Sequence, residues 1–589
     1  MPGSPLARGP TSGRPSLAPL AALFGGGLLI GLVLATQWAR LPVPDVSWLL
    51  YVAGRVSGGA EYGLDIVDVA PPPIIWYSVP AVWLGHWAHL TVWRAYILIL
   101  AVTGLVILWL VREIVRRLPG WDAAHRQALL GAAAVATYVL PWAVFGEREH
   151  VALVLVLPYV LLFAARESRA RIPLWLAVVV GALAGFGFAI KPHFVVPWAA
   201  LALAALWRRG EVALSRRGEF VAASLAAASG IVAVLALQPG YVGYMRRFGS
   251  LYLQYVPQDP LFVALVGESN SAVVVVVAMV ATAVLWRSLR ESARPVVLYL
   301  LVAATGFHAV ALLQLKGWRY HYLPGLAFSF VLLLVLWMNV RPPLLRLVSR
   351  AYRAAALATV VVLLGSAALG SATRLSGSES ATFDPNFERL LLVVQRYGGS
   401  RPVAVLSANL ASAFPLASEA GVGWASRYGG LPWLPAFYED QVRAGRVVRP
   451  RPYAARSELE HSFGERVVAD LRQSNPGLII IPVVQAGGSF HHLFDYLAYF
   501  DEVPGFRELL KGYRPIGRVG SYSILQHRTI AAQPVGVFPE KLVVAPRARE
   551  WLSDGGEKLI LALLVVGTLF LADARERRRA QVAASSQPV

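Results

Sequence analysis

The chain has 589 residues, of which 57% are hydrophobic and 15% are charged, and its mean hydropathy is +0.56. Soluble domains are about one quarter charged, so this composition excludes a single soluble domain and predicts a multi-span membrane protein. The net charge of +20 comes from short basic clusters between apolar runs, which is typical of cytoplasmic loops rather than of nucleic-acid binding. The chain has no cysteine, which excludes disulfides, thiolate metal sites and cysteine nucleophiles.

The first apolar run extends from about Leu17 to Ala39 and follows Arg8 and Arg14. It is too long for a typical signal peptide, so we expect a span with the N-terminus in the cytoplasm and Asp45 outside. The next apolar run, 74–90, is short and crowded with Trp and His, which are residues of the membrane interface. We predict an interfacial or re-entrant element there, and a full span is the alternative.

The rest of the membrane part alternates between apolar runs and arginine clusters. Because the clusters belong in the cytoplasm, their order predicts roughly twelve spans with both ends inside. Eight spans are predicted at 17–39, 93–110, 127–145, 173–190, 220–238, 296–315, 354–369 and 559–571. The other four predicted spans each end at one of the arginine clusters at 166–171, 208–217, 287–294 and 341–353.

A long stretch before the last span has the composition of a soluble protein. Residues 402–407, 476–482 and 521–525 are typical of strands, and residues 388–397, 462–474 and 494–500 of helices. We therefore predict a transmembrane domain at 1–371 with a large first periplasmic loop at 40–92. A small periplasmic α/β domain at 372–556 and a last transmembrane helix with a basic tail at 557–589 follow.

Polar groups of both signs gather in the loops that this topology places outside the membrane. They are Asp45, Asp65, Asp68, Glu147, Glu149, His150, Lys191, His193, Lys316, Arg319 and His321. Asp45 is the candidate general base, although a single such carboxylate is most often merely solvated. The cationic stretch at 316–321 runs against the positive-inside pattern, which favours binding of an anion such as a lipid phosphate.

Two of these groups have competing interpretations. Glu147, Glu149 and His150 could hold a divalent cation or orient an acceptor, but their spacing matches no established metal motif. A salt-bridged structural role around Arg148 is the alternative. Lys191 stands at a span end, where lysines often only snorkel to the interface.

The layout resembles the GT-C superfamily of integral membrane glycosyltransferases. That family pattern has an acidic residue soon after the first span, then a Tyr-x-Asp-type stretch, Pro-Pro and aromatic residues, here Asp45, 62–68 and 72–77. The polar motif at 147–150 also fits, and the stretch 316–324 is similar to one in uncharacterised bacterial GT-C-like proteins. Two features depart from relatives. Protein O-mannosyltransferases pair Asp with Glu, where Val46 follows here, and aminoarabinose transferases place Lys before the Pro-Pro, where Ala70 and Pro71 stand.

The resemblance implies an inverting transfer of a sugar from a polyprenyl-phosphate donor to a periplasmic glycan, lipid or protein acceptor. Asp45 would be the base, and the Lys, Arg and His groups would hold the lipid phosphate. The protein would lie in the bacterial inner membrane with its site facing the periplasm, with a divalent cation as the possible cofactor. A lipid-linked-sugar transporter or flippase would instead show ionisable groups near the midplane. A non-catalytic scaffold of an envelope polysaccharide pathway is a third interpretation, since Asp45 lacks an adjacent acid.

Overall fold

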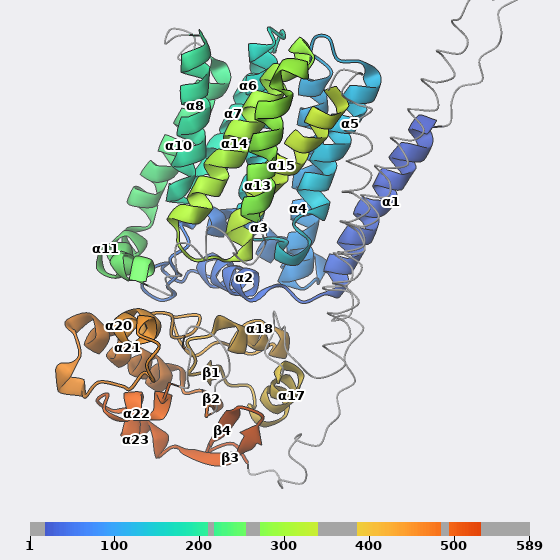
Figure 1. Ribbon diagram of the computed structural model, residues 1–589. Coiled ribbons are helices and arrows are strands. Elements are labelled where there is room, and N and C mark those ends of the chain that lie inside the picture. The colour runs from blue at the N-terminus through green and yellow to red at the C-terminus, as the bar shows by residue number, and fades with distance from the viewer. Residues whose placement is uncertain are drawn as a thin grey trace, which may run out of the picture.

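The computed structural model describes residues 18–209, 217–254, 271–339, 386–483, 490 and 494–531. These residues form a helical bundle with a small α/β unit at one of its ends (Figure 1). The spans predicted at 354–369 and 559–571 lie outside the described residues.

The bundle helices lie on the apolar runs that the sequence indicates. They are α1 (Ala18–Ala39), α4 (Val92–Val115), α5 (Ala123–Ala134), α6 (Arg148–Glu167), α7 (Leu174–Ala189), α8 (Val195–Arg209), α10 (Gly218–Leu237), α13 (Ser271–Leu285), α14 (Arg294–Leu313) and α15 (Arg319–Asn339). Within the described ranges, five helices are long and apolar enough to cross a membrane, or up to six if a bent pair forms one span. The membrane character is therefore confirmed, while the total of twelve spans stays a prediction.

Burial differs sharply between helices of the bundle. Helix α6 is enclosed by other helices, whereas α10 is almost entirely exposed, as a lipid-facing helix would be. Helices α7 and α10 approach closely because Gly181 and Gly185 lack side chains. A Cβ atom at either glycine would lie 2.3 Å from a carbonyl oxygen of α10. Small residues thus fix this crossing by backbone packing.

Two helices lie at the end of the bundle that faces the α/β unit. Helix α1 is followed, across a 72° bend, by α2 (Pro44–Ser57). Helix α3 (Pro72–Ala88) ends just before α4, whose Trp93 donates hydrogen bonds to the carbonyls of Gln37 and Arg40 at the end of α1. Trp83 and Trp87 of α3 are 62% and 82% exposed. These positions agree with an interfacial element at 74–90.

The α/β unit contains a four-stranded sheet of order β1-β2-β4-β3. Its strands are β1 (Val403–Val405), β2 (Leu478–Pro482), β3 (Tyr513–Val519) and β4 (Tyr522–His527). Strands β1 and β2 are parallel, and the other two pairs are antiparallel. The predicted strands correspond to β1, β2 and β4. Strand β3 was not predicted, and its pairing shifts register between Pro515 and Gly517, residues that also weaken the strand signal in the sequence.

Helices surround this sheet and connect it to the bundle. The three predicted helices are α17 (Phe387–Tyr397), α21 (Glu458–Ser474) and α22 (Tyr496–Asp501). Short helices that were not predicted are α18 (Leu416–Ala420), α19 (Leu434–Phe437), α20 (Glu439–Arg443) and α23 (Phe506–Leu510). Helix α11 (Pro239–Gln254) follows α10 and packs against α19, where the Trp433 indole donates to the Tyr244 hydroxyl at 2.8 Å. The unit and the bundle therefore share buried contacts.

Candidate functional site

Ionisable residues converge where the bundle meets the α/β unit. Asp45 lies in the first turn of α2, and Asp68 lies in the loop 58–71 between α2 and α3. Glu147 caps the start of α6, and Lys191 follows the end of α7. These segments are far apart in the sequence, and their meeting at one end of the bundle creates the candidate site.

A tight turn sets the start of α6. Gly146 has φ +88°, and a Cβ atom there would lie 3.0 Å from the ring of Tyr96, whose hydroxyl donates to the Gly146 carbonyl at 3.0 Å. The Gly146 amide donates to Nδ1 of His150 at 3.0 Å, and His150 Nε2 donates to the Thr137 carbonyl at 2.8 Å. Both ring nitrogens are therefore used. His150 therefore shapes this turn, and its role in substrate binding stays a prediction.

A buried ion pair joins α6 to the loop after α7. Lys191 Nζ donates to Glu149 Oε1 at 2.5 Å and to Gln314 Oε1 at 2.9 Å. The side chains of Lys191 and Glu149 are 5% and 1% exposed. Nε2 of His321 lies 3.7 Å from Glu149 Oε1, and Glu149 Oε2 has no hydrogen-bond partner among the residues that the structure describes. Lys191 is thus a built part of the site and does not snorkel to the surface.

Arg148 is the central cation of the site, and sequence reasoning missed this role. Its guanidinium lies 5.9 Å from the ring centre of Tyr320, which Lys191 Nζ also approaches, at 5.8 Å. It also interacts electrostatically with Asp45 and with the two glutamates that flank it. The flanking glutamates suggested a local salt bridge. The sequence did not reveal that distant carboxylates face the same cation.

Burial governs the acids of the site. It raises the pKa of the Asp45 carboxyl, and the Arg148 guanidinium opposes that shift. Burial likewise raises the pKa of Asp68, again against the effect of Arg148. The pKa of Glu147 is raised well above its usual range, first by burial and then by the Asp45 carboxylate. Burial therefore makes all three carboxyls easier to protonate than exposed ones, and Glu147 is an acidic neighbour of Asp45 supplied by another helix.

Other predicted residues lie around this cluster. His321 is buried against Trp318 and Tyr320, and His193 is partly buried next to Lys191. Lys316 is buried, donates to the Tyr252 carbonyl at 2.8 Å and lies 5.0 Å from the centre of that residue's ring. Arg319 is partly buried in the first turn of α15.

Asp65 is not brought into the site. It is exposed, and its Oδ2 accepts a hydrogen bond from the Glu61 amide at 2.9 Å. That bond closes a turn in the loop 58–71. Asp65 therefore has a structural role in this loop, and its contribution to substrate binding stays a prediction.

A divalent cation would need a different arrangement of ligands from the one observed. Within the described ranges, no group of three or more His, Asp or Glu side chains is placed to hold a metal ion. Of the three residues considered for metal binding, His150 uses both ring nitrogens, and Glu149 is paired with Lys191. The residues present at 147–150 thus do not fit the predicted metal site.

Two crystal structures of ArnT from Cupriavidus metallidurans share this fold. The one bound to undecaprenyl phosphate aligns with a TM-score of 0.51 and 13% identity, over 88% of this chain and 100% of that chain. The apo structure aligns with a TM-score of 0.50 and 14% identity, over 87% and 98% of the two chains. No protein-family model and no curated protein sequence matches the chain. These alignments show that the chain shares the fold of ArnT over most of the length of both proteins.

Proposed function

We propose that this protein transfers a sugar, with inversion, from a polyprenyl phosphate to an acceptor hydroxyl. One observation carries the proposal: a partly buried carboxylate, Asp45, meets the cations Arg148 and Lys191 at one end of a GT-C-type membrane bundle. The ArnT neighbour, which was crystallised with undecaprenyl phosphate, supports a donor of this lipid class. The acceptor is a glycan, a lipid or a protein.

The proposed step is a single displacement at the anomeric carbon. Asp45 accepts the proton of the acceptor hydroxyl, and the oxygen of that hydroxyl attacks the anomeric carbon of the donor sugar. The bond between that carbon and the phosphate oxygen breaks, and the polyprenyl phosphate leaves with the electron pair. Arg148 and Lys191 stabilise the charge that develops on the leaving phosphate. Burial raises the pKa of the Asp45 carboxyl, which makes it a stronger base than an exposed aspartate.

Charge distribution supports a site that faces the periplasm. Helix α4 begins beside Arg40, near the site. Its last turn, which contains Arg112, lies at the opposite end of the helix, away from the site. The arginines after α4 and at the end of α6 therefore lie away from the site, as the positive-inside rule expects of the cytoplasmic side. With this orientation, the α/β unit would lie outside the cytoplasm.

The placement of charge also favours an enzyme over a transporter. A flippase would be expected to carry ionisable groups near the middle of the membrane. Here the acids and cations of the candidate site come from the first turn of α2, the N-terminus of α6 and the loop after α7. A scaffold without activity would not need a carboxylate facing two cations, so the geometry favours catalysis.

The test is a transfer assay with purified protein and a panel of polyprenyl-phosphate sugars. Asp45→Asn should lower kcat by roughly 10²–10⁴-fold, because the amide cannot accept the proton. Glu508→Gln is the matched control, since it alters a carboxylate of the α/β unit whose side chain is 64% exposed, and it should retain wild-type transfer. Equal transfer by wild type and Asp45→Asn would exclude Asp45 as the base.

A further inference from the structure

The two halves of the candidate site are held by different parts of the protein. The cations Arg148 and Lys191 belong to the bundle, at the start of α6 and after α7. The carboxylates Asp45 and Asp68 belong to α2 and to the loop 58–71, which lie between the bundle and the α/β unit. What holds α2 and this loop therefore decides how the acids face the cations.

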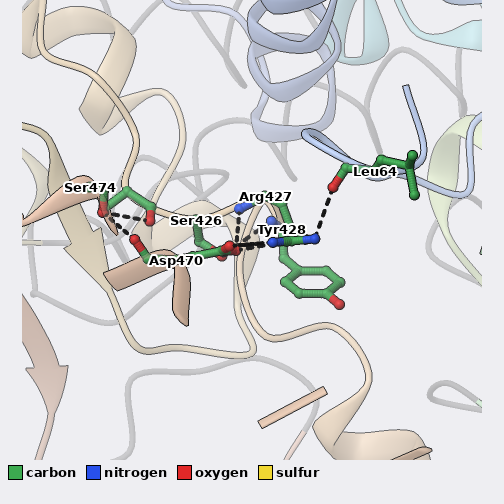
Figure 2. Close-up of polar contacts among 7 residues, drawn as sticks. Leu64, Ser426, Arg427, Tyr428, Asp470 and Ser474 are labelled. Atoms are coloured by element: carbon green, nitrogen blue, oxygen red, sulfur yellow. Dashed lines mark hydrogen bonds and ion pairs between the residues drawn. The ribbon is translucent and has the colours of Figure 1, made fainter. Parts of the chain in front are cut away.

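The loop is attached to the α/β unit next to Asp68. The Val67 amide donates to the Arg427 carbonyl at 2.9 Å, and Val67 forms a β-bridge with Tyr428. The Arg427 side chain reaches back to the same loop, where Nη1 donates to the Leu64 carbonyl at 3.0 Å (Figure 2). Arg427 thus binds the loop through both its backbone and its guanidinium.

The same guanidinium is anchored in the α/β unit by Asp470 of α21. Nε and Nη2 of Arg427 donate to Asp470 Oδ1 at 3.0 and 2.7 Å, and the Arg427 amide donates to Oδ2 at 2.9 Å. Figure 2 shows Arg427 between Asp470 and Leu64. A guanidinium has enough donors in fixed directions to bind a carboxylate and a carbonyl together, whereas an ammonium offers a single point of attachment.

Helix α2, which carries Asp45, rests on the same unit. The Trp48 ring lies 5.0 Å from the Phe414 ring, and the Tyr51 hydroxyl accepts a hydrogen bond from the Trp424 amide at 2.9 Å. A Cβ atom at Gly429, two residues after Arg427, would lie 2.7 Å from the Trp48 ring. The segment that binds the Asp68 loop therefore also abuts the first turns of α2.

We infer that Arg427 is a positioning residue for the proposed transfer, because it ties the carboxylate half of the site to the α/β unit at a fixed distance from the cation half. This inference rests on the proposed function. The α/β unit is thus part of the catalytic apparatus without contributing a reacting group. Its loss or displacement moves Asp68 and α2, while Arg148 and Lys191 stay in place on the bundle.

The kinetic test compares substitutions at two Arg–Asp pairs of the α/β unit. Arg427→Ala should lower kcat at least tenfold and leave the donor KM nearly unchanged, because small displacements of reacting groups cost rate while the cations still bind the phosphate. Arg427→Lys should recover only part of kcat. Arg507→Ala is the matched control, since Arg507 pairs with Asp501 through two nitrogens in the same unit, at 2.9 and 2.6 Å, and kcat should be unchanged.

A second measurement tests positioning without activity. The natural chain has no cysteine, so Val69→Cys reports on the loop 58–71 through its rate of maleimide labelling in the full-length protein. Arg427→Ala should raise that rate several-fold, and Arg507→Ala should not. Should Arg427→Ala fail to fold, as judged by thermal unfolding, Asp470→Asn gives the same comparison.

The outcomes separate the two proposals. No transfer by wild type from any donor would refute the proposed function, while faster labelling in Arg427→Ala would still support positioning of the loop. An unchanged labelling rate in folded Arg427→Ala, or a kcat equal to that of wild type, would overturn the positioning role of Arg427.

Discussion

Replacing Lys191 with methionine tests the buried ion pair on which the cation half of the site depends. The substitution removes the bonds from Lys191 to Glu149 at 2.5 Å and to Gln314 at 2.9 Å, so Glu149, which is 1% exposed, loses its hydrogen-bonded cation. Breaking a buried pair from one side costs about 3–5 kcal/mol, because the remaining charge stays desolvated. We expect the free energy of unfolding to fall by that amount.

A second substitution at Glu149 should compensate for the loss of Lys191. The double variant Lys191→Met with Glu149→Gln removes both charges, so most of the lost stability should return. Lys511→Met is the matched control, because Lys511 forms a 2.8 Å pair with Glu508 in which both side chains are more than 60% exposed. Such a pair contributes little, and its loss should leave stability nearly unchanged.

Denaturant unfolding in mixed micelles, followed by tryptophan fluorescence, measures these differences, since the chain contains 18 tryptophans. Two results would refute the reasoning. One is a Lys191→Met variant within about 1 kcal/mol of wild type, far below the cost of an orphaned buried charge. The other is a double variant no more stable than the single one.

Three further outcomes follow from the site and its loop. Because burial raises the pKa of Asp45, kcat/KM should fall as pH is lowered through that raised pKa and level off above it; a flat pH–rate profile would contradict this. Arg148→Gln should lower kcat roughly 10²–10³-fold in the transfer assay, as for loss of one charge-stabilising donor, and unchanged kcat would exclude its role at the phosphate. Gly63→Ala should lower the melting temperature, because Gly63 has φ +97° and a Cβ atom there would lie 2.2 Å from the Tyr241 amide nitrogen. Gly54→Ala should leave the melting temperature unchanged, because a Cβ atom at Gly54 would meet nothing within 4 Å. Equal melting temperatures for the two variants would refute the clash at Gly63.

The sequence predicted much of the membrane fold, because hydropathy and arginine clusters report directly on burial in lipid and on topology. The prediction of an interfacial element at 74–90 depended on the arginines after α4 as well as on its own aromatic composition. The sheet was harder to predict. Strand β3 carries Pro515 and Gly517 at its register shift, so its alternation is interrupted where the pairing changes.

The candidate site shows what residue type alone cannot decide. Asp65 and Asp68 stand three residues apart in one loop, yet Asp65 closes a turn with the Glu61 amide, while Asp68 faces Arg148. The structural role of His150 depends on the turn at Gly146, whose amide donates to its ring. Contacts made across the chain decided these roles, and such contacts leave no local signature in the sequence.

Charge balance links the acids of the site to its proposed ligand. Asp45, Asp68, Glu147 and Glu149 carry four negative charges when ionised, against two positive charges on Arg148 and Lys191, which leaves a net charge of −2. A cluster with that charge would repel a phosphate. Burial opposes that repulsion, because it raises the pKa of Asp68 and of Glu147 and so widens the pH range over which each carboxyl can take up a proton.

With Asp68 and Glu147 neutral, the same six groups sum to zero, and a phosphate meets two cations without excess negative charge. Donor binding should therefore strengthen as pH falls and these acids take up protons, while the chemical step weakens as Asp45 is protonated. The two trends oppose each other. The donor KM should fall toward acidic pH, and kcat should fall with it, whereas a site that binds phosphate through permanently charged groups alone would show a donor KM that does not change with pH.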